Sequence, residues 1–447
     1  MSKITTPIAD FVKHYAAGNI SRLHMPAHKG NSLLGCEALD ITEINGADVL
    51  YSANGIIDES ERNATKLFGT AHTFYSTEGS TLAIKAMLAL VKRNSKKKSK
   101  ILAARNIHKA FIYACALLDL EVEWIYPDKA LHLCDCSLTP SELKRKLSSM
   151  SELPCALYVT SPTYLGEILD IKGLSEVCKE FGIYLLVDNA HGAYLAFERP
   201  SQHPIALGAD MCCDSAHKTL PTLTGGAYLH ISKSFTPFDK DDTRNMLSLF
   251  ASTSPSYLTL QSLDLTNAYL ANGFSEKLAA VEKKVDALKN ELAALGFDSA
   301  GDESLKIVIT RDSCSYSGIE LASRLREHNV EPEYADLDAL VLMISTETAD
   351  VDFERIKSTF ASIPARNASV ACPPRILPCK QMLSLREAIF SQSERINVKK
   401  AVGRICAAPS VSCPPAIPPI VSGELITAEA AELLLYYGIE EIDVIKL

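Results

Sequence analysis

Two stretches of the sequence decide the fold: VDNAHGAYL at residues 187–195 and DSAHKTLPTLTGGAYL at residues 214–229. Each continues a short, near-continuous apolar run, which is typical of a strand that is buried on both faces. Asp188 and Lys218 therefore lie just beyond the carboxyl ends of two predicted strands. Ligands of open α/β sheets bind at that edge, so these stretches predict the place of a site as well as the fold.

Similar apolar runs alternate with helical patterns over residues 65–231, as in βαβ units that build a mainly parallel sheet. The predicted strands are residues 101–104, 156–160, 183–187, 209–213 and 226–231, and the predicted covering helices are residues 80–93 and 174–181. A long amphipathic helix is predicted over residues 275–295, with Ser275 as its N-cap and Gly296 as its stop. Beyond it, predicted strands (306–310, 340–345) and helices (317–327, 351–360) form a smaller α/β unit.

We therefore expect an α/β protein with a mainly parallel sheet in its large domain and a smaller C-terminal α/β domain. The expected divisions are an N-terminal arm at residues 1–45, a large ligand-binding domain at 46–274, a linker helix with the small domain at 275–365, and a proline-rich C-terminal subdomain at 366–447.

The composition of the chain limits its class and partners. Its 447 residues include 45 Lys and Arg against 54 Asp and Glu, a formal charge of -9, which argues against nucleic acid or an anionic membrane as the main partner. No run of ~20 apolar residues predicts a membrane span, and the first residues lack the apolar core of a signal peptide, so we expect a cytoplasmic protein. The thirteen cysteines show no paired zinc-ligand spacing, so we expect buried structural thiols and no metal.

Three clusters at strand ends could carry chemistry. Gly79, Ser80 and Thr81 open a predicted helix, where backbone N–H groups and hydroxyls suit a phosphate, although a simple helix cap explains them too. Asp188 at a strand tip needs a metal, an Arg or a protonated ring nitrogen, unless it caps the following turn. Lys218 can act as a nucleophile toward carbonyls if it enters a cleft, although most lysines are solvated.

Together, the three clusters match what pyridoxal 5'-phosphate (PLP) requires of a protein. Its aldehyde forms a Schiff base with a lysine, its pyridinium nitrogen pairs with an aspartate, and its phosphate lies on a helix N-terminus. The 30 residues between Asp188 and Lys218 leave room for a crossover and a further strand.

The chain resembles the ornithine/lysine/arginine decarboxylase family of fold type I PLP enzymes, in its short bacterial form without an N-terminal wing domain. The segments that carry the resemblance are LHMPAHKG (23–30), STEGST (76–81), ARNIHKA (104–110), TSPTYLGEILDI (160–171), VDNAHGAYL (187–195), DSAHKTLPTLTGGAYL (214–229), STSPSY (252–257), AVGRICA (401–407) and CPPAIPPIVSGE (413–424). The resemblance implies PLP as the cofactor of the large domain.

The resemblance also implies roles for single residues. Lys218 would form the Schiff base, and Asp188 would pair with the pyridinium nitrogen. Around the phosphate it implies Gly79, Ser80, Thr81, Ser215 and His217. His108 would stack on the pyridine ring, Ala190 would pack against its other face, and His191 would lie near the phenolic oxygen or the substrate. Ser252 and Ser254 would reach the phosphate of a partner subunit, which implies a homodimer with shared active sites.

The function implied by this resemblance is decarboxylation of arginine, lysine or ornithine, which gives a di- or polyamine and carbon dioxide. His217 or Lys218 would return a proton to the α-carbon. Glu333, Asp336 and Glu424 are candidates to bind the basic side chain, or else solvated acids. An aminotransferase or β-eliminating lyase stays open because the fold hosts these reactions too, and so does a regulatory protein without turnover.

Overall fold

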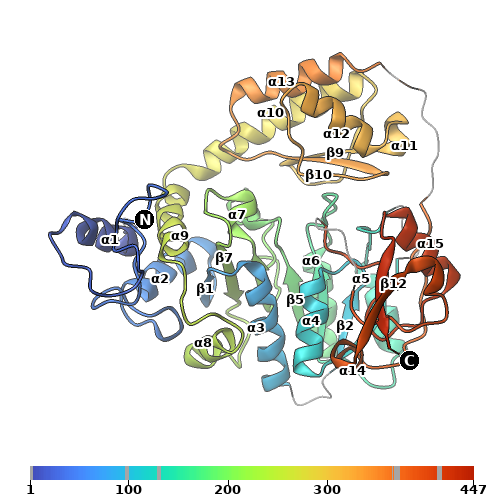
Figure 1. Ribbon diagram of the computed structural model, residues 1–447, viewed down its shortest axis with the longest axis horizontal. Coiled ribbons are helices and arrows are strands. Elements are labelled where there is room, and N and C mark those ends of the chain that lie inside the picture. Colours follow the sequence, from blue (N-terminus) through green and yellow to red (C-terminus); the bar gives the residue numbers. More distant parts are fainter. Residues whose placement is uncertain are drawn as a thin grey trace. The chain divides into compact units, whose positions relative to one another are not determined.

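The computed structural model describes residues 4–95, 100–127, 132–364, 366, 373–409 and 415–446 (Figure 1). The chain divides into two compact units. Unit 1 comprises Met1–Lys96 and Ile171–Leu278, and unit 2 comprises Lys97–Asp170 and Ala279–Leu447.

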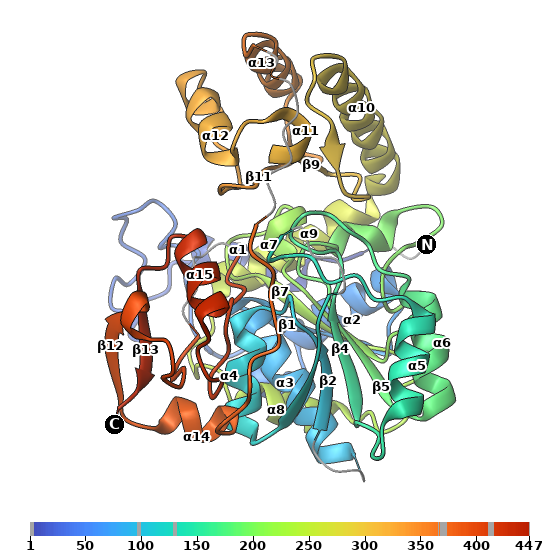
Figure 2. The same cartoon turned by 90° about the vertical axis from the view of Figure 1, so that its right-hand side faces the viewer.

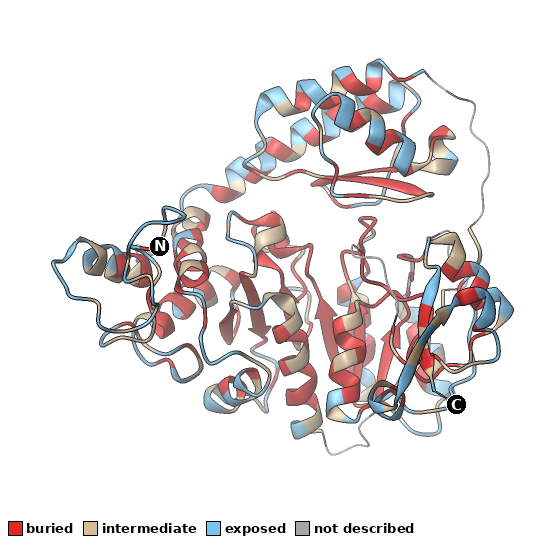
Figure 3. Ribbon diagram, viewed as in Figure 1, coloured by how far each residue is buried: buried red, intermediate tan, exposed pale blue. Residues whose placement is uncertain are grey.

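Unit 1 contains four sheet strands in the order β1 (His72–Ser76), β7 (Ala227–Ile231), β6 (Met211–Asp214) and β5 (Tyr184–Asp188). Strands β5 and β6 are parallel, whereas β7 runs antiparallel to both β6 and β1. Helix α3 (Gly79–Asn94) packs across all four strands. The strands are buried almost throughout, as Figure 3 shows in red, because their apolar side chains are covered by helices.

The remaining helices of unit 1 surround this sheet. They are α1 (Pro7–Ala17), η1 (Leu50–Ser52), α2 (Ile56–Phe68), α6 (Ile171–Phe181), η2 (Ala193–Phe197), α7 (Ala216–Thr219), α8 (Lys240–Ser248) and α9 (Tyr257–Ala271). Helix α2 packs against β1, and α6 packs against β5. Helix α10 (Phe274–Ala294) carries the chain from unit 1 into unit 2.

Unit 2 contains three groups of strands. Strands β3 (Glu121–Ile125), β2 (Lys100–Ala104) and β4 (Ala156–Thr160) are parallel, with β2 between the others. The second group is antiparallel, in the order β10 (Tyr334–Ala335), β11 (Ala339–Met343), β9 (Lys306–Thr310) and β8 (Ser299–Ala300). Strands β12 (Ser393–Asn397) and β13 (Glu441–Ile445) pair with each other (Figure 2).

Helices accompany each strand group of unit 2. They are α4 (Lys109–Leu118), α5 (Pro140–Ser149), α11 (Arg311–Cys314), α12 (Gly318–Glu327), α13 (Asp350–Ala361), α14 (Leu385–Phe390), η3 (Val398–Lys400) and α15 (Ala428–Tyr436). Helices α10, α12 and α13 lie on one face of the antiparallel sheet in Figures 1 and 2. Helix α14 packs against α4, and α15 packs against η3.

The predicted α/β class is confirmed, and each predicted strand lies within two residues of an observed one. The sequence analysis missed β1, whose His72 and Thr73 are buried although polar, and the edge strand β3, whose residues are charged or partly exposed. Ser275 as an N-cap is wrong, because α10 begins at Phe274 and the Ser275 hydroxyl instead donates to the Phe197 carbonyl at 2.8 Å. The domain boundaries stay a prediction.

Two further expectations concern cysteines and membranes. The cysteines that the structure describes are free thiols, and most of them are buried. Within the described part of the chain, no helix is long and apolar enough to cross a membrane.

The first helix of unit 1 is held by a buried carboxylate on α9. The backbone N–H groups of Ile8 and Ala9 both donate to Asp264 Oδ2 at 2.9 Å, and the Ser60 hydroxyl donates to Oδ1 at 2.5 Å. Burial nevertheless raises the pKa of Asp264 to about 6. These hydrogen bonds attach the start of α1 to the core.

Asp264 should make the stability of the protein depend on pH. Because its folded pKa lies above its ordinary value of 3.8, the native state binds the proton more tightly, and its stability falls as pH rises from about 4 to about 6. We expect the free energy of unfolding of the wild type to lose up to about 3 kcal/mol over this window relative to Asp264→Asn. Urea denaturation at several pH values measures the difference.

The matched control is Asp242→Asn, which removes a partly exposed carboxylate that pairs with Arg93 at the surface. The difference in the free energy of unfolding between Asp242→Asn and the wild type should not change over the same pH window. A wild-type-to-Asp264→Asn difference that stays constant, or that grows with pH, would contradict the assignment.

Candidate active site

The first predicted cluster lies at the N-terminus of α3, and unit 1 builds it from two strand ends. Gly79 has a φ of +70°, which favours glycine, and its N–H donates to the Gly225 carbonyl at 2.8 Å. Ser80 and Thr81 follow in the first helical turn. The Ser215 hydroxyl, directly after β6, donates to Ser80 Oγ at 2.9 Å. This part of unit 1 therefore combines hydroxyls with helix N–H groups, which suit an anion.

Glu78 connects this cluster to the predicted phosphate segment at residues 252–254. Its Oε1 accepts the Ser252 N–H at 2.8 Å, and the Ser254 N–H donates to Ser252 Oγ at 3.1 Å. Ser252 and Ser254 are exposed in the single chain. Their predicted contact with a partner subunit stays a prediction.

Asp188 ends β5 and is buried, as the sequence predicts. Its Oδ1 accepts the Ala190 N–H at 3.2 Å and lies 3.6 Å from Cys213 Sγ. A buried carboxylate is costly unless hydrogen bonds or a cation compensate it. Asp188 therefore suits a cationic ligand atom better than a neutral one.

Lys218 lies in the four-residue helix α7, and a single residue, Ser215, separates this helix from the end of β6. Its Nζ lies 3.0 Å from Nε2 of the buried His191. The Nδ1 atom of His217 donates to the Gly226 carbonyl at 3.0 Å, because that oxygen can only accept. The Lys218 amine and the His191 imidazole are thus close enough to exchange a proton. The hydrogen bond to Gly226 fixes the tautomer of His217 when that imidazole is neutral.

His108 belongs to unit 2, where it caps α4. Its Nδ1 accepts the Ala110 N–H at 3.1 Å, and the next residue, Lys109, donates its N–H to the Ala416 carbonyl at 2.9 Å. The predicted stacking of His108 on a cofactor ring stays a prediction.

The three acids proposed for a basic side chain also lie in unit 2, and their surroundings differ. Glu333 is exposed, and its Oε1 accepts the Tyr164 hydroxyl at 2.9 Å. Asp336 accepts from His132 Nε2 at 2.8 Å and from the Tyr334 hydroxyl at 2.6 Å. Burial opposes its ionisation, but the contacts with His132 outweigh burial and lower the pKa of Asp336.

Glu424 is almost completely buried. It accepts the Tyr126 hydroxyl at 3.2 Å and the Val421 N–H at 2.9 Å, and its Oε2 lies 4.0 Å from Arg105 Nη2. Burial raises the pKa of Glu424, although the positive charge of Arg105 opposes this. Its contacts make Glu424 part of the packing of the C-terminal segment.

Sequence reasoning gave no role to two buried charged residues that lie within the quoted motifs. Asp214 ends β6 four residues before Lys218, and Arg105 directly follows β2. The guanidinium of Arg105 donates to the Pro418 and Pro419 carbonyls at 2.8 and 3.0 Å. A charged residue immediately after an apolar strand was the available signal for both, as it was for Asp188.

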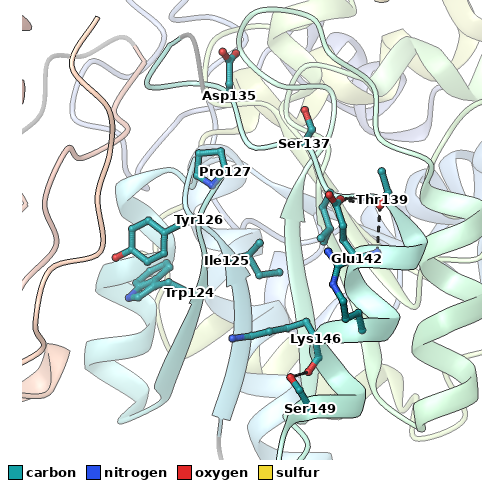
Figure 4. A pocket seen from close by; sticks show the side chains of 12 residues that line it. Trp124, Ile125, Tyr126, Pro127, Asp135, Ser137, Thr139, Glu142, Lys146 and Ser149 are labelled. Carbon is teal, nitrogen blue, oxygen red and sulfur yellow. Dashed lines mark hydrogen bonds between the residues drawn. The ribbon is translucent and has the colours of Figure 1, made fainter. Parts of the chain in front are cut away.

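A hollow of about 710 Å³ in unit 2 contains none of the predicted site residues. Figure 4 shows it between Trp124 and Tyr126 from the β3 segment and Glu142 and Lys146 from α5. Among the described residues, side chains of the kinds that bind metals also lie close together in three clusters: His203–Cys212–Asp214, Asp58–Glu61–His72 and His132–Asp336–Asp338. Each cluster already contains ion pairs or hydrogen bonds, and the expectation of no metal stays a prediction.

Comparisons with known proteins identify the family. The model described as "Orn/Lys/Arg decarboxylase, major domain" matches residues 26–298, and its C-terminal domain model matches residues 377–442. Over 96% of this chain, the protein is 29% identical to YaaO of Bacillus subtilis (strain 168), an uncharacterized protein, and 28% identical to arginine decarboxylase of the same organism. The matches cover 94% and 93% of those relatives.

Solved structures share the fold at lower identity. Lysine decarboxylase LdcF of Francisella novicida superposes with a TM-score of 0.81 at 17% identity, over 99% of this chain and 81% of that one. The constitutive lysine decarboxylase of E. coli superposes with a TM-score of 0.78 at 17% identity, over 99% of this chain and 82% of that one. Serine palmitoyltransferase of Sphingomonas wittichii superposes with a TM-score of 0.54 at 17% identity, over 68% of this chain and 74% of that one. The fold is therefore that of the fold type I PLP enzymes, and the chain belongs to the Orn/Lys/Arg decarboxylase family.

Proposed function

We propose that this decarboxylase uses PLP to act on a basic L-amino acid, arginine, lysine or ornithine, and releases carbon dioxide and a di- or polyamine. The observation that carries the proposal is that unit 1 has a buried carboxylate, an amine beside an imidazole, and hydroxyls at a helix N-terminus, all at the ends of strands. Relatives named arginine decarboxylase support the choice of a basic substrate.

The residues of unit 1 fit the chemical groups of PLP. The Lys218 amine suits the aldehyde, the buried Asp188 carboxylate suits a protonated pyridine nitrogen, and the turn with Ser80 and Ser215 suits the phosphate. When bound, PLP supplies the electron sink that accepts the electron pair left as carbon dioxide departs. Asp188 would hold the proton on the ring nitrogen, since its charged form is favoured beside a cation.

The chain's own groups can also move protons. His191 Nε2 lies 3.0 Å from Lys218 Nζ, close enough to take a proton from the amine or return it. Because neutral His217 has its Nδ1 proton bound to the Gly226 carbonyl, its Nε2 would be free of a proton. Lys218, or His217 once it is protonated, would deliver a proton to the α-carbon.

For the basic side chain of the substrate we favour Glu333 among the three predicted acids. Its carboxylate is exposed and accepts one hydrogen bond through Oε1, from Tyr164. Asp336 and Glu424 accept several hydrogen bonds each from this chain, so a ligand would have to displace them. An accessible carboxylate pairs most readily with an ammonium or guanidinium group.

A homodimer with shared active sites, located in the cytoplasm, completes the proposal. Unit 1 exposes large apolar side chains in its N-terminal arm, with exposed fractions of 92% for Leu23, 69% for Met25, 87% for Leu33 and 89% for Leu34. Exposed apolar side chains gathered in one segment are typical of a surface that a partner covers. A small-molecule substrate is the other expected partner, with neither nucleic acid nor membrane.

The alternative reactions stay possible on this fold, because serine palmitoyltransferase shares it. The products separate them. Carbon dioxide with an amine supports the proposal, a keto acid with aminated cofactor indicates an aminotransferase, and pyruvate with ammonia indicates a β-eliminating lyase. A regulatory protein would consume no amino acid.

The first prediction concerns Lys218. A carbon dioxide release screen of the PLP-loaded protein against all standard amino acids should find release from arginine, lysine or ornithine. Lys218→Ala should lower kcat at least about 10³-fold and abolish the visible absorbance of the lysine-bound cofactor. Lys233→Ala, which changes an exposed lysine of the same unit, serves as the control. Unchanged turnover and absorbance in Lys218→Ala would refute the assignment.

The second prediction concerns Glu333. Glu333→Gln removes the charge but keeps an acceptor for Tyr164, and should raise KM for the basic substrate by about 10- to 100-fold with little change in kcat. Steady-state kinetics with Glu331→Gln as control measures this, since Glu331 pairs with Arg326 at the surface. Equal kinetics of the two variants would remove Glu333 from substrate binding.

The third prediction concerns the shared site. Light scattering should give the mass of a dimer, and Lys218→Ala and Ser252→Ala/Ser254→Ala proteins should each have low activity. When their subunits are exchanged, mixed dimers should recover activity, because one of the two sites then has both an intact lysine and intact partner serines. Absence of recovery in confirmed mixed dimers would mean that each subunit has its own complete site.

A further inference from the structure

Asp214 is a fully buried carboxylate whose three hydrogen-bond partners come from other segments of unit 1. Its Oδ1 accepts from Asn189 Nδ2 at 2.7 Å. Its Oδ2 lies 3.1 Å from His203 Nε2 and 3.0 Å from His230 Nε2. All four side chains are at most 1% exposed. We call these four residues the Asp214 cluster.

The contacts indicate which groups of the Asp214 cluster are charged. Burial opposes ionisation of Asp214, but the contacts with His203 and His230 outweigh it and hold its pKa well below the usual range. Burial lowers the pKa of His230, whose Nδ1 is 2.9 Å from the Thr73 hydroxyl. Neutral imidazoles that donate through Nε2 satisfy these contacts.

His203 leads to the same conclusion. Its Nδ1 has no hydrogen-bond partner among the described residues, so protonation would bury an unsatisfied N–H group. The same lack argues against a metal here, because a metal-bound imidazole ordinarily donates its other N–H to an acceptor. The cluster therefore contains a single negative charge, on Asp214.

The cluster connects the segments that carry the predicted cofactor residues. Asn189 directly follows Asp188 at the end of β5, and Asp214 ends β6 four residues before Lys218. His230 lies on β7 and reaches β1 through Thr73. Phe68 packs against the His230 ring at 4.5 Å between centroids, which excludes water from this side of the cluster. A change in Asp214 is thus transmitted directly to the backbone around both Asp188 and Lys218.

We propose that Asp214 is a positioning residue, which fixes the ends of β5 and β6 so that Asp188 and Lys218 can hold the cofactor, and whose charge favours protonated groups nearby. This inference rests on the proposed function only in so far as PLP binds at Lys218. The amide of Asn189 transmits the effect to Asp188, and the chain from β6 into α7 transmits it to Lys218.

Other titratable groups face these residues. Those near Asp214 are His203, His230, Cys212, Cys213, Tyr228 and Asp188. Burial raises the pKa of the two thiols and of the Tyr228 phenol, so these groups stay uncharged at neutral pH. Lys218 faces His191. A pH-dependent signal from the bound cofactor would therefore report on Lys218 and His191, under the influence of the Asp214 charge.

The test begins with Asp214→Asn, which removes the charge and places an NH₂ group where the carboxylate accepted hydrogen bonds. We expect the Kd of the apoprotein for PLP to rise about tenfold or more, as for loss of one charge-assisted hydrogen bond. The pH midpoint of the visible absorbance of the PLP-loaded protein should fall by about one unit, because loss of a nearby negative charge disfavours the protonated form.

Two further variants separate positioning from a general loss of stability. Asp264→Asn removes another buried carboxylate of unit 1, which contacts α1 and Ser60, and should leave the pH midpoint unchanged. The exchange variant Asn189→Asp/Asp214→Asn keeps the hydrogen bonds. The amide introduced at position 214 would donate to the carboxylate introduced at position 189, and the amide oxygen would accept from both histidines. This variant should fold and restore the Kd to within about threefold of the wild type.

The outcomes are distinct. If Asp214→Asn has the wild-type Kd and pH midpoint, or if the exchange variant fails to fold or to restore the Kd, the proposal is overturned. Should Asp214→Asn itself fail to fold, the exchange variant still decides. A wild-type protein that binds PLP but releases no carbon dioxide would refute the proposed function and leave this inference intact.

Discussion

The structure of unit 1 depends on the burial of carboxylates at the carboxyl ends of two adjacent parallel strands, β5 and β6. Asp188 pairs in register with Cys213, and Asp214 is the next residue along β6. Two buried like charges at neighbouring positions of paired strands would destabilise the fold unless each is compensated. Asp214 is compensated by three donors of the chain itself. Asp188 accepts the Ala190 N–H and lies near the Cys213 thiol, and it is the carboxylate that the proposed function pairs with a cationic ligand atom.

The predictable part of the fold was the part with continuous apolar strands. Strands β4 and β9 were predicted to the residue because most of their side chains are apolar and four of the five positions in each are buried. Strand β1 was missed because its polar residues are buried against partners on other elements: His72 contacts Glu61 on α2, and Thr73 contacts His230 on β7. Such contacts leave no local pattern, since a buried polar residue looks like a solvated one until its partner is known.

The same limit applies to the site. Lys218, Asp188 and Ser80 could be singled out as candidates because each lies within a few residues of a strand end or a helix start, which is a local property. His203 and His230 were not, because only the fold brings them to Asp214. Glu424 shows the same limit: the sequence offered it as a candidate for substrate binding, but not its burial beside Arg105, which lies 319 residues earlier in the chain.

Membership of the decarboxylase family therefore leaves the question of substrate to the acids that the chain does not itself use. A carboxylate that accepts several internal hydrogen bonds has little to gain from a ligand, because each new contact replaces an existing one. Asp336 and Glu424 are in this position, whereas Glu333 is exposed and accepts from Tyr164 through a single oxygen. An ammonium needs one such oxygen, and a guanidinium uses both in a planar pair. Because each carboxylate oxygen has two lone pairs, the Tyr164 hydroxyl on Oε1 leaves room on Glu333 for either cation, so this hydrogen bond orients the carboxylate without selecting among arginine, lysine and ornithine.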